Sequence, residues 1–464
     1  MVVKINSHIQ CEDIKGLREA IDIDLKISNP KYLQAVRMGI STYGIPKHLY
    51  LYSERIIYKE KQLPYMPATD TTLLIPRQYT RVLQEQFKNI PVVDEMTDGY
   101  KIISLQSSIT LREYQKKAVE VLVNTDNGIL EAPCGAGKTI ICLEAVAKVG
   151  VTTLIIVNTT ALLEQWKERI KQVFGNSVRI GTIQGNTIDY KDKDIVVGMI
   201  PTLLKSKLPD DLFSYFGLVV SDECHRIAAL KWSEVIQRFP ARRRWGLTAT
   251  PFRDDGLDIV FRMHIGHIIH KVELESLKPT IYGISTGFFI DEKEFLNKRS
   301  KQFSYVNFIS SVANLERRNN MIIEYLLRGL GKGRKILVLS DRIAQLEYLK
   351  AKVDIVGRYK SMLYTAETPK DERLKAGETD VIFGISTLAK EGLDIPALDT
   401  LFIASPFKSS ITVQQAVGRI LRSYEGKQEP IVYDFIDNNI SICKSLSYKR
   451  KTIYTNLGYT FIPR

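Results

Sequence analysis

Short, uninterrupted apolar runs recur along most of this chain. A strand that is buried on both faces has such a run, because neither of its sides alternates with polar positions. Amphipathic helical patterns separate the runs, for example at 161–174 and 343–353. This alternation predicts the α/β fold class with parallel sheets. The apolar runs lie at 154–157, 195–200, 218–220, 336–339, 381–385, 401–404 and 431–433.

The strand and helix patterns form two successive sets, which predict two α/β domains at 101–270 and 271–464. Both lengths suit domains of the usual size, about 100–200 residues. Residues 1–100 lack the alternation and combine strand-like pieces at 49–52 and 56–58 with several prolines. This composition indicates a small N-terminal α+β accessory domain, which we interpret as a possible DNA-binding domain.

Charge and cysteine content narrow the class of protein. The 464 residues include 65 Lys and Arg against 52 Asp and Glu, a formal net charge of +13. This excess favours a polyanionic partner such as nucleic acid, and it fits equally a basic surface that serves only solubility. Five cysteines without paired spacing argue against a disulfide framework, and no apolar stretch has the length of a signal peptide or membrane helix. We therefore expect a soluble, cytoplasmic protein without membrane association.

Residues 132–139 have the pattern of a nucleotide-phosphate loop. They lie between a strand-like run and a helical one, so their glycines turn the chain at a helix N-terminus, where backbone N–H groups bind anions. Lys138 would reach the β- and γ-phosphates of ATP, and the Thr139 hydroxyl would hold Mg²⁺. The candidate ligands in the loop are Pro133, Cys134, Gly135, Ala136, Gly137, Lys138 and Thr139.

Two adjacent acids, Asp222 and Glu223, follow the buried strand at 218–220. Open α/β sheets bind ligands at the carboxyl ends of their strands, so this position suits catalysis. Asp222 suits a ligand of Mg²⁺, and Glu223 suits a base that orients and deprotonates the attacking water. A solvated turn is the alternative interpretation. Thr248 and Thr250 end another strand that we expect nearby.

Two further segments contain side chains that could contact a nucleotide. Gln115 opens a predicted helix, and its amide could pair with the donor–acceptor edge of adenine, although alone it marks only a helix start. Arg419 and Arg422 are three residues apart, which predicts one helix face from which both could reach a phosphate. An arginine finger is one interpretation, and a surface pair that forms salt bridges is the other.

The motifs occur in the order LREYQ, APCGAGKT, VNTTALLEQW, DECH, LTATP, STLAKEGLDIP and QQAVGRILR. As a set, over about residues 105–437, they resemble the superfamily 2 helicases of the DExH kind. Within that superfamily the chain is most similar to XPB-like repair helicases and phage helicases of the UvsW type. The resemblance implies two tandem RecA-like domains, with ATP in the cleft and a nucleic-acid strand across their top.

The resemblance also implies roles for the residues that match the family motifs. Adenine would be held by Arg112 and Gln115, and Mg-ATP by the phosphate loop and Asp222. The second domain would contribute Gly392, Asp394, Gln415, Arg419 and Arg422. The state of the bound nucleotide would be coupled to the binding of the nucleic-acid strand by His225, Thr248 and Thr250. The phosphates of the strand would be contacted by Thr159, Thr202 and Thr387.

The expected function is that of an ATP-dependent DNA helicase or translocase, acting as a monomer on forked, branched or duplex DNA in recombination, repair or replication. Its catalytic residues would be Lys138, Glu223, Arg419 and Arg422. One alternative is an RNA helicase or transcript-release factor with the same motor core. The other is a nucleic-acid-binding ATPase that acts as a switch and moves no strand.

Overall fold

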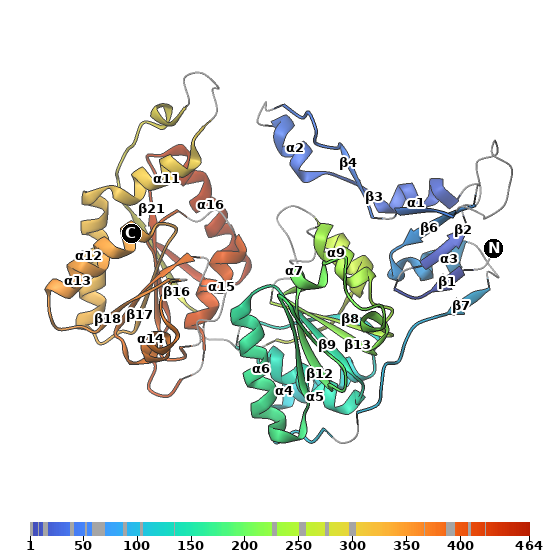
Figure 1. Cartoon of the computed structure of the whole chain (residues 1–464). Helices are drawn as coiled ribbons and strands as arrows, with labels where there is room; N and C mark the ends of the chain where they lie inside the picture. The colour runs from blue at the N-terminus through green and yellow to red at the C-terminus, as the bar shows by residue number, and fades with distance from the viewer. Residues whose placement is uncertain are drawn as a thin grey trace. The chain divides into compact units, whose positions relative to one another are not determined.

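The computed structural model describes most of the chain, and it forms two compact units, Met1–Glu273 and Leu274–Arg464. Figure 1 shows β-sheets with helices on their faces in both units. The described residues are 3–7, 9–12, 17–37, 41–51, 53–57, 70–86, 91–102, 105–133, 135–224, 230–249, 257–273, 278–296, 303–365, 367–386, 395–406, 410–422 and 424–464.

The first unit begins with a mixed five-stranded sheet in the order β5-β6-β2-β1-β7. β1 and β7 run parallel, and the other neighbours run antiparallel. Apolar side chains of two helices, among them Leu17, Ile21 and Leu83, pack against this sheet and confirm the expected α+β character. The elements are β1 (Val3–Ile5), β2 (Ile9–Glu12), α1 (Leu17–Leu25), β5 (Ser53–Ile57), β6 (Asp70–Ile75), α3 (Thr80–Gln86) and β7 (Val92–Asp94).

We call residues 26–51 the arm, of which the structure describes 26–37 and 41–51. It consists of β3 (Lys26–Ser28), α2 (Pro30–Arg37) and β4 (His48–Tyr50), and β3 pairs antiparallel with β4 (Figure 1). Asn29 closes the outer end of this strand pair, because its backbone N–H donates to the carbonyl of Lys47 at 3.0 Å and its side-chain amide donates to that of Pro46 at 2.8 Å.

Two buried arginines attach the small sheet to the larger sheet of the same unit. Arg77 donates through Nη1 to the carbonyl of Ala241 at 2.6 Å and through Nη2 to that of Arg242 at 3.0 Å. Arg244 donates in the opposite direction, to the carbonyl of Ser7 at 2.6 Å. Separation of the two sheets would leave buried charges and carbonyls unsatisfied, so these bonds favour a single rigid body.

The larger sheet of the first unit has eight strands in the order β11-β10-β12-β9-β13-β14-β8-β15. All neighbouring strands are parallel except β10 and the edge strand β11. The strands are β8 (Asn127–Glu131), β9 (Thr153–Val157), β10 (Ile180–Gln184), β11 (Thr187–Asp189), β12 (Ile195–Met199), β13 (Leu218–Asp222), β14 (Arg243–Thr248) and β15 (Ile268–Lys271).

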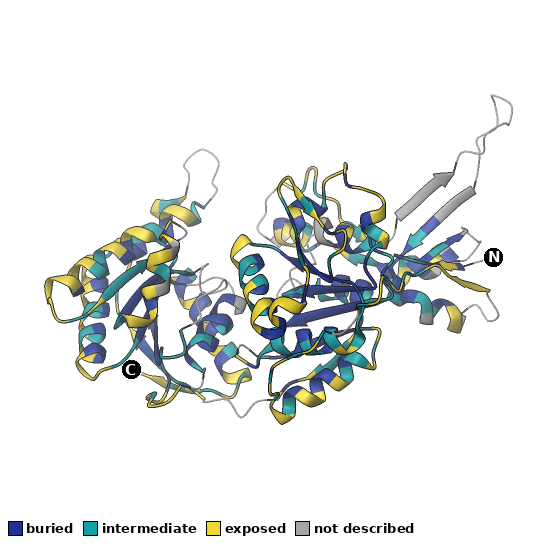
Figure 2. Cartoon of the chain, turned by 60° about the horizontal axis from the view of Figure 1, so that its bottom comes forward, coloured by how far each residue is buried: buried dark blue, intermediate teal, exposed yellow. Residues whose placement is uncertain are grey.

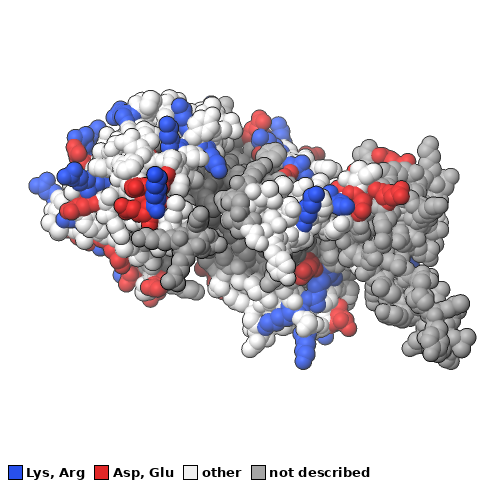
Figure 3. Space-filling model, turned by 90° about the horizontal axis from the view of Figure 1, so that it is seen from above, with Lys and Arg blue, Asp and Glu red and all other residues white. Residues whose placement is uncertain are grey.

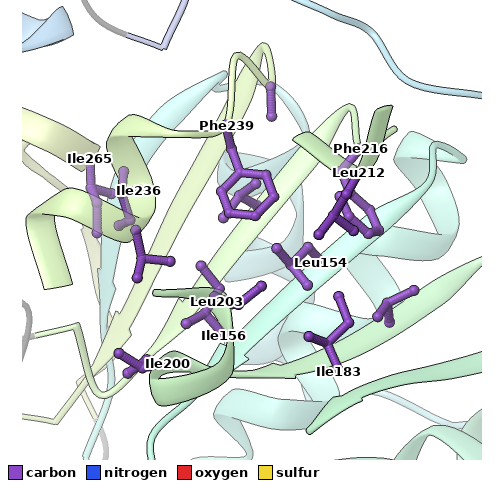
Figure 4. Packing of buried hydrophobic residues seen from close by; sticks show 14 of the residues in the cluster. Leu154, Ile156, Ile183, Ile200, Leu203, Leu212, Phe216, Ile236, Phe239 and Ile265 are labelled. Carbon is purple, nitrogen blue, oxygen red and sulfur yellow. The ribbon is translucent and has the colours of Figure 1, made fainter. Parts of the chain in front are cut away.

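Helices cover both faces of this sheet. Leu154 and Ile156 of β9 point to one face, where Leu203 of α7 and Ile236 of α9 complete an apolar core (Figure 4). On the other face, α5 packs between α4 and α6. The helices are α4 (Glu113–Val123), α5 (Lys138–Val149), α6 (Thr160–Phe174), α7 (Ile200–Leu203), α8 (Asp211–Ser214), α9 (Leu230–Gln237) and α10 (Asp258–Ile265).

The second unit contains a fully parallel seven-stranded sheet in the order β18-β19-β17-β20-β21-β16-β22. The strands in the middle of the unit are buried and the outer sides of the helices are exposed (Figure 2). The strands are β16 (Thr280–Ser285), β17 (Ile336–Ser340), β18 (Ser361–Tyr364), β19 (Val381–Ile385), β20 (Thr400–Ile403), β21 (Ile431–Ile436) and β22 (Thr460–Pro463).

Buried ion pairs fasten two helices to β21 and to Asp437, which directly follows this strand. Arg318 of α12 pairs with Asp437 at 2.9 Å, and Arg450 of α16 pairs with Asp434 through two bonds of 2.9 and 2.7 Å. Tyr454 donates a third bond to Asp434 at 3.0 Å. The helices of the unit are α11 (Tyr305–Asn314), α12 (Glu316–Gly331), α13 (Ile343–Ile355), α14 (Lys370–Leu374), α15 (Ser410–Ile420) and α16 (Ser441–Asn456).

Each apolar run that predicted a strand falls on a strand of the structure. The ends agree to within one residue except at the C-terminal ends of β13 and β21, where the strand continues for two and three residues beyond the predicted run. The expected helix through both arginines of the last motif is wrong at its C-terminus, because α15 ends at Ile420 and Arg422 lies beyond it. There the chain turns back toward β21 through Gly426, whose φ of +72° favours glycine. The two arginines therefore do not share a helix face.

We expect Arg450→Met to loosen the second unit strongly, because it leaves the Asp434 carboxylate buried without its cation. The amides of β21 and α16 should lose about 3–5 kcal/mol of opening free energy in hydrogen exchange. Arg328→Met removes a partner of the exposed pair with Glu324 and should cost less than about 1 kcal/mol. Equal losses in the two variants would contradict the importance of the buried pair.

Candidate functional site

Three adjacent parallel strands of the first unit end at one edge of the sheet. β14 lies between β8 and β13, with Thr248 opposite Glu131 and Leu247 opposite Asp222. The phosphate loop follows Glu131, Thr248 ends the middle strand, and Glu223 follows Asp222. The loop, the threonine and the acid pair, which are far apart in the sequence, are thus brought together as parallel pairing requires.

The phosphate loop turns through two glycines in left-handed backbone. Gly135 has a φ of +86° and Gly137 a φ of +80°, and α5 begins directly afterwards at Lys138. The first N–H groups of a helix have no partner within the helix, so they face the loop as anion donors. The Nζ of Lys138 donates to the carbonyl of Ala132 at 3.1 Å, which holds the cation over the loop. Cys134 lies outside the described residues.

Gln115 is fastened to the phosphate loop. Its Nε2 donates to the carbonyl of Ala136 at 3.1 Å, and its Oε1 accepts from the backbone N–H of Arg112 at 2.9 Å. A Cβ added at Gly137 would lie 2.6 Å from this Nε2. The amide expected to pair with adenine therefore supports the loop in this structure, whereas the Arg112 side chain is exposed.

The acid pair lies in an enclosed environment at the end of β13. Burial and the neighbouring Glu223 carboxylate raise the pKa of Asp222 to about 6, while a hydrogen bond from Trp166 acts in the opposite direction. The indole Nε1 of Trp166 donates to Asp222 Oδ2 at 2.8 Å, and the backbone N–H of Glu223 donates to Oδ1 at 3.0 Å. Glu223 has a φ of +50°, a strained backbone for a residue with a side chain.

These groups fit Mg-ATP by their chemistry. Carboxylate and hydroxyl oxygens are the ligands that Mg²⁺ prefers, and Asp222 and Thr139 supply one of each. The helix N-terminus and Lys138 supply positive charge for the phosphates. Since Lys138 also acts electrostatically on Asp222, the cation and the carboxylate belong to the same site.

The other candidates in the first unit differ in their surroundings. Thr159 is the N-cap of α6 and accepts from the backbone N–H of Leu162 at 3.3 Å. Thr202 is buried, and its hydroxyl accepts from the N–H of Gly185 at 2.9 Å, which indicates a structural role. Thr248 is fully buried. His225 and Thr250 lie outside the described residues.

In the second unit, Gln415 and Arg419 lie one turn apart on α15, and Gln415 is buried. The backbone of Arg422 is held by Lys427. The Nζ of Lys427 donates to the carbonyl of Arg422 at 2.7 Å and to that of Pro396 at 2.9 Å. Burial lowers the pKa of Lys427 to about 8. Thr387, Gly392 and Asp394 lie outside the described residues.

Sequence reasoning did not identify Trp166 or Lys427 as contributors to these sites. Lys427 belongs to no motif and reaches back to two segments through its long side chain. Trp166 stands at an apolar position of α6, where its indole signals packing alone. A buried tryptophan needs an acceptor for its N–H, which is the only signal that could have pointed to a polar partner.

Two family models match the chain. Residues 108–253 match "Type III restriction enzyme, res subunit", and residues 317–424 match "Helicase conserved C-terminal domain". A solved structure of yeast Dbp5 bound to RNA and ADP BeF3 is 14% identical, covers 77% of this chain and 90% of its own, and has a TM-score of 0.53. That likeness concerns the fold.

Several curated proteins are similar over most of their length. "Putative ATP-dependent RNA helicase" of Acanthamoeba polyphaga mimivirus is 29% identical over 80% of this chain and 72% of its own. "DNA 3'-5' translocase XPB2" of Sulfurisphaera tokodaii is 28% identical over 72% and 84%. "ATP-dependent DNA helicase uvsW" of Enterobacteria phage T4 is 28% identical over 78% and 76%.

Two α/β sheets with parallel strands, and a phosphate loop and an acid pair at the edge of the first, have the fold of two RecA-like domains, and the expected fold class is confirmed. The two matched regions are similar to the two motor domains of superfamily 2 helicases, and the relatives of the chain include XPB and phage UvsW proteins. This similarity implies the use of ATP in nucleic-acid unwinding. None of the helices in the described part of the chain is long and apolar enough to cross a membrane.

We expect Gly137→Ala to weaken nucleotide binding at least about tenfold, because the new methyl group would push Gln115 from the loop and strain the left-handed backbone. The dissociation constant for ADP, measured by calorimetry, reports this loss. Gly175→Ala is the matched control, since Gly175 also has a positive φ of +60° but nothing lies within 4 Å of the added carbon. Equal affinities in the two variants would contradict the role of the Gln115 contact.

Proposed function

We propose that this protein is an ATP-dependent DNA helicase or translocase that acts on forked, branched or duplex DNA in recombination, repair or replication. The observation that carries the proposal is the meeting of Lys138, Asp222 and Glu223 at one edge of the first RecA-like sheet. A second RecA-like sheet in the same chain supports a motor over a simple ATPase, because a motor needs two such bodies.

Hydrolysis follows from the chemistry of the named side chains. Lys138 and the N-terminus of α5 bind the β- and γ-phosphates, and Thr139 and Asp222 would hold Mg²⁺. Bound Mg²⁺ would neutralise charge on the phosphates. Glu223 orients the attacking water and accepts its proton, and its strained backbone fixes where its carboxylate can point.

From the second unit, we propose that Gln415, Arg419 and Arg422 act on the γ-phosphate. Guanidinium groups suit this task because they stay charged and bind phosphate oxygens through a planar fork. Lys427 supports the position of Arg422 through its backbone carbonyl. Gly392 and Asp394 would lie beside the nucleotide, as they do in the family motif.

The names of two of the relatives support DNA as the substrate. The Sulfurisphaera protein is named a DNA translocase and the T4 protein a DNA helicase. Contacts by Thr159 and Thr387 would go to backbone phosphates, which position a strand without selecting its sequence. An RNA helicase or transcript-release factor is the second candidate, supported by the name of the mimivirus relative.

The arm of the N-terminal region supports a role in DNA binding. Residues 26–51 contain Lys26, Lys31, Arg37 and Lys47 and neither Asp nor Glu. Tyr43 is 96% exposed in the arm and 49% of Tyr50 is exposed, with the Nζ of Lys26 5.5 Å from the Tyr50 ring centre. Elsewhere, on the face shown in Figure 3, basic and acidic side chains are interspersed over the described parts of both units. The acid-free arm therefore offers charge of one sign together with rings on which bases stack.

We expect Lys138→Ala to lower ATP hydrolysis by on the order of a hundredfold or more while forked DNA still binds, because the lysine serves phosphate and not DNA. Hydrolysis and fork binding should be measured side by side.

The wild-type protein should be tested with single-stranded, duplex, forked and four-way DNA and with RNA duplexes. Preferential stimulation and unwinding by RNA would establish the second candidate, and no stimulation by any nucleic acid would establish a switch that moves no strand.

We expect Tyr43→Ala to weaken binding of forked DNA by about 1–3 kcal/mol, the contribution of one stacked base. Fluorescence anisotropy of a labelled fork at fixed salt measures it. Tyr100→Ala removes another exposed tyrosine of the first unit, which follows Asp98 and Gly99, and should leave fork affinity unchanged. ATP hydrolysis without DNA should be normal in both variants, and a normal fork affinity of Tyr43→Ala would contradict the role of the arm.

A further inference from the structure

One tryptophan of the first unit hydrogen-bonds to a carboxylate of the ATP site. Trp166 lies in α6 with 2% of its surface exposed, and its Nε1 donates to Asp222 Oδ2 at 2.8 Å. Trp245 of the same unit is equally enclosed, but its Nε1 donates to the carbonyl of Thr125 at 3.0 Å. A backbone carbonyl satisfies an indole as well, so the carboxylate partner of Trp166 is not required by burial alone.

The bond from Trp166 fixes the orientation of the Asp222 carboxyl group. The backbone N–H of Glu223 donates to Oδ1 and the indole donates to Oδ2, so each oxygen has one fixed donor. Two donors on opposite oxygens define the plane of the carboxylate. Each oxygen keeps a further lone pair, which remains for a metal ion or its water.

The same helix begins at a candidate contact for the nucleic-acid strand. Thr159 caps α6 at the carboxyl end of β9, and the side-chain amide of Gln184 donates to the hydroxyl of Thr160 at 3.0 Å. From Thr159 to Trp166 the helix spans roughly 10 Å. Because Leu163 and Trp166 are both buried, a displacement at the start of α6 is transmitted to the indole through packed atoms.

We propose that Trp166 is a positioning residue for Asp222, and that α6 thereby links strand contact at Thr159 to the geometry of the carboxylate that would hold Mg²⁺. The link through α6 to the nucleic-acid strand rests on the proposed function. The positioning of Asp222 by Trp166 does not rest on it, because Mg²⁺-dependent nucleotide binding needs no strand. An experiment can therefore contradict one of these two statements without contradicting the other.

The test is Trp166→Phe, which keeps an aromatic ring in the core and removes the N–H donor. ADP binding is measured by calorimetry with and without Mg²⁺. We expect unchanged ADP affinity without Mg²⁺. The increase in ADP affinity on addition of Mg²⁺, which we call the Mg²⁺ gain, should be about tenfold smaller than in the wild type, as for loss of a partner that orients a metal ligand. Stimulation of ATP hydrolysis by forked DNA should fall in the same variant.

Trp245→Phe is the matched control, since it removes an indole N–H with similar burial from β14 of the same unit. It should leave both the Mg²⁺ gain and the stimulation by DNA as in the wild type. A normal Mg²⁺ gain in Trp166→Phe, or an equal loss in Trp245→Phe, would overturn the proposal for Asp222. A reduced Mg²⁺ gain with normal stimulation by DNA would overturn the link through α6.

A measurement on the unsubstituted side chain keeps the test valid if Trp166→Phe does not fold. The chain has three tryptophans, Trp166, Trp232 and Trp245, so their indole N–H resonances in protein labelled with ¹⁵N-tryptophan can be assigned with Trp232→Phe and Trp245→Phe. Addition of Mg²⁺ and ADP should move the Trp166 resonance more than ADP alone. Equal movement with and without Mg²⁺ would overturn the proposal.

Discussion

Parallel pairing of β8, β14 and β13 is the constraint on which the chemistry of this protein depends. Hydrogen bonds in register place Thr248 opposite Glu131 and Leu247 opposite Asp222, so three segments distant in the sequence must end together. The phosphate loop can meet an acid pair only if that register is kept. A shift of one residue in β13 would turn the Asp222 side chain to the other face of the sheet, away from Trp166.

Nucleotide binding would have to change bonds that the loop already makes. Lys138 donates to the carbonyl of Ala132, and Gln115 donates to that of Ala136, so the loop is braced by its own backbone acceptors. Phosphate oxygens would compete with the first of these acceptors. Adenine would compete for the Gln115 amide, and one side chain would then couple recognition of the base to the shape of the loop that holds the phosphates.

The sequence predicted the strands well because strands buried on both faces have an apolar run that no other element of this length shares. It predicted the acid pair and the loop because their chemistry needs particular residues side by side. It missed the bond between Trp166 and Asp222 because the partners lie 56 residues apart and meet only through the sheet. It also extended α15 too far, since nothing in its sequence before Arg422 marks the end of a helix.

The buried arginines explain how the N-terminal region can contribute to a motor. Arg77 and Arg244 bond to backbone carbonyls across the boundary between the small and the large sheet, in opposite directions. Carbonyls carry only partial charge, so burial of Arg77 lowers its pKa to about 10, a cost that an exposed linker would avoid. The bonds of Arg77 and Arg244 are made in spite of this cost, and they keep the two sheets together. In the proposed motor, DNA held by the arm would therefore move with the sheet that contains the phosphate loop, and a change in that sheet during the ATP cycle would act on the DNA directly.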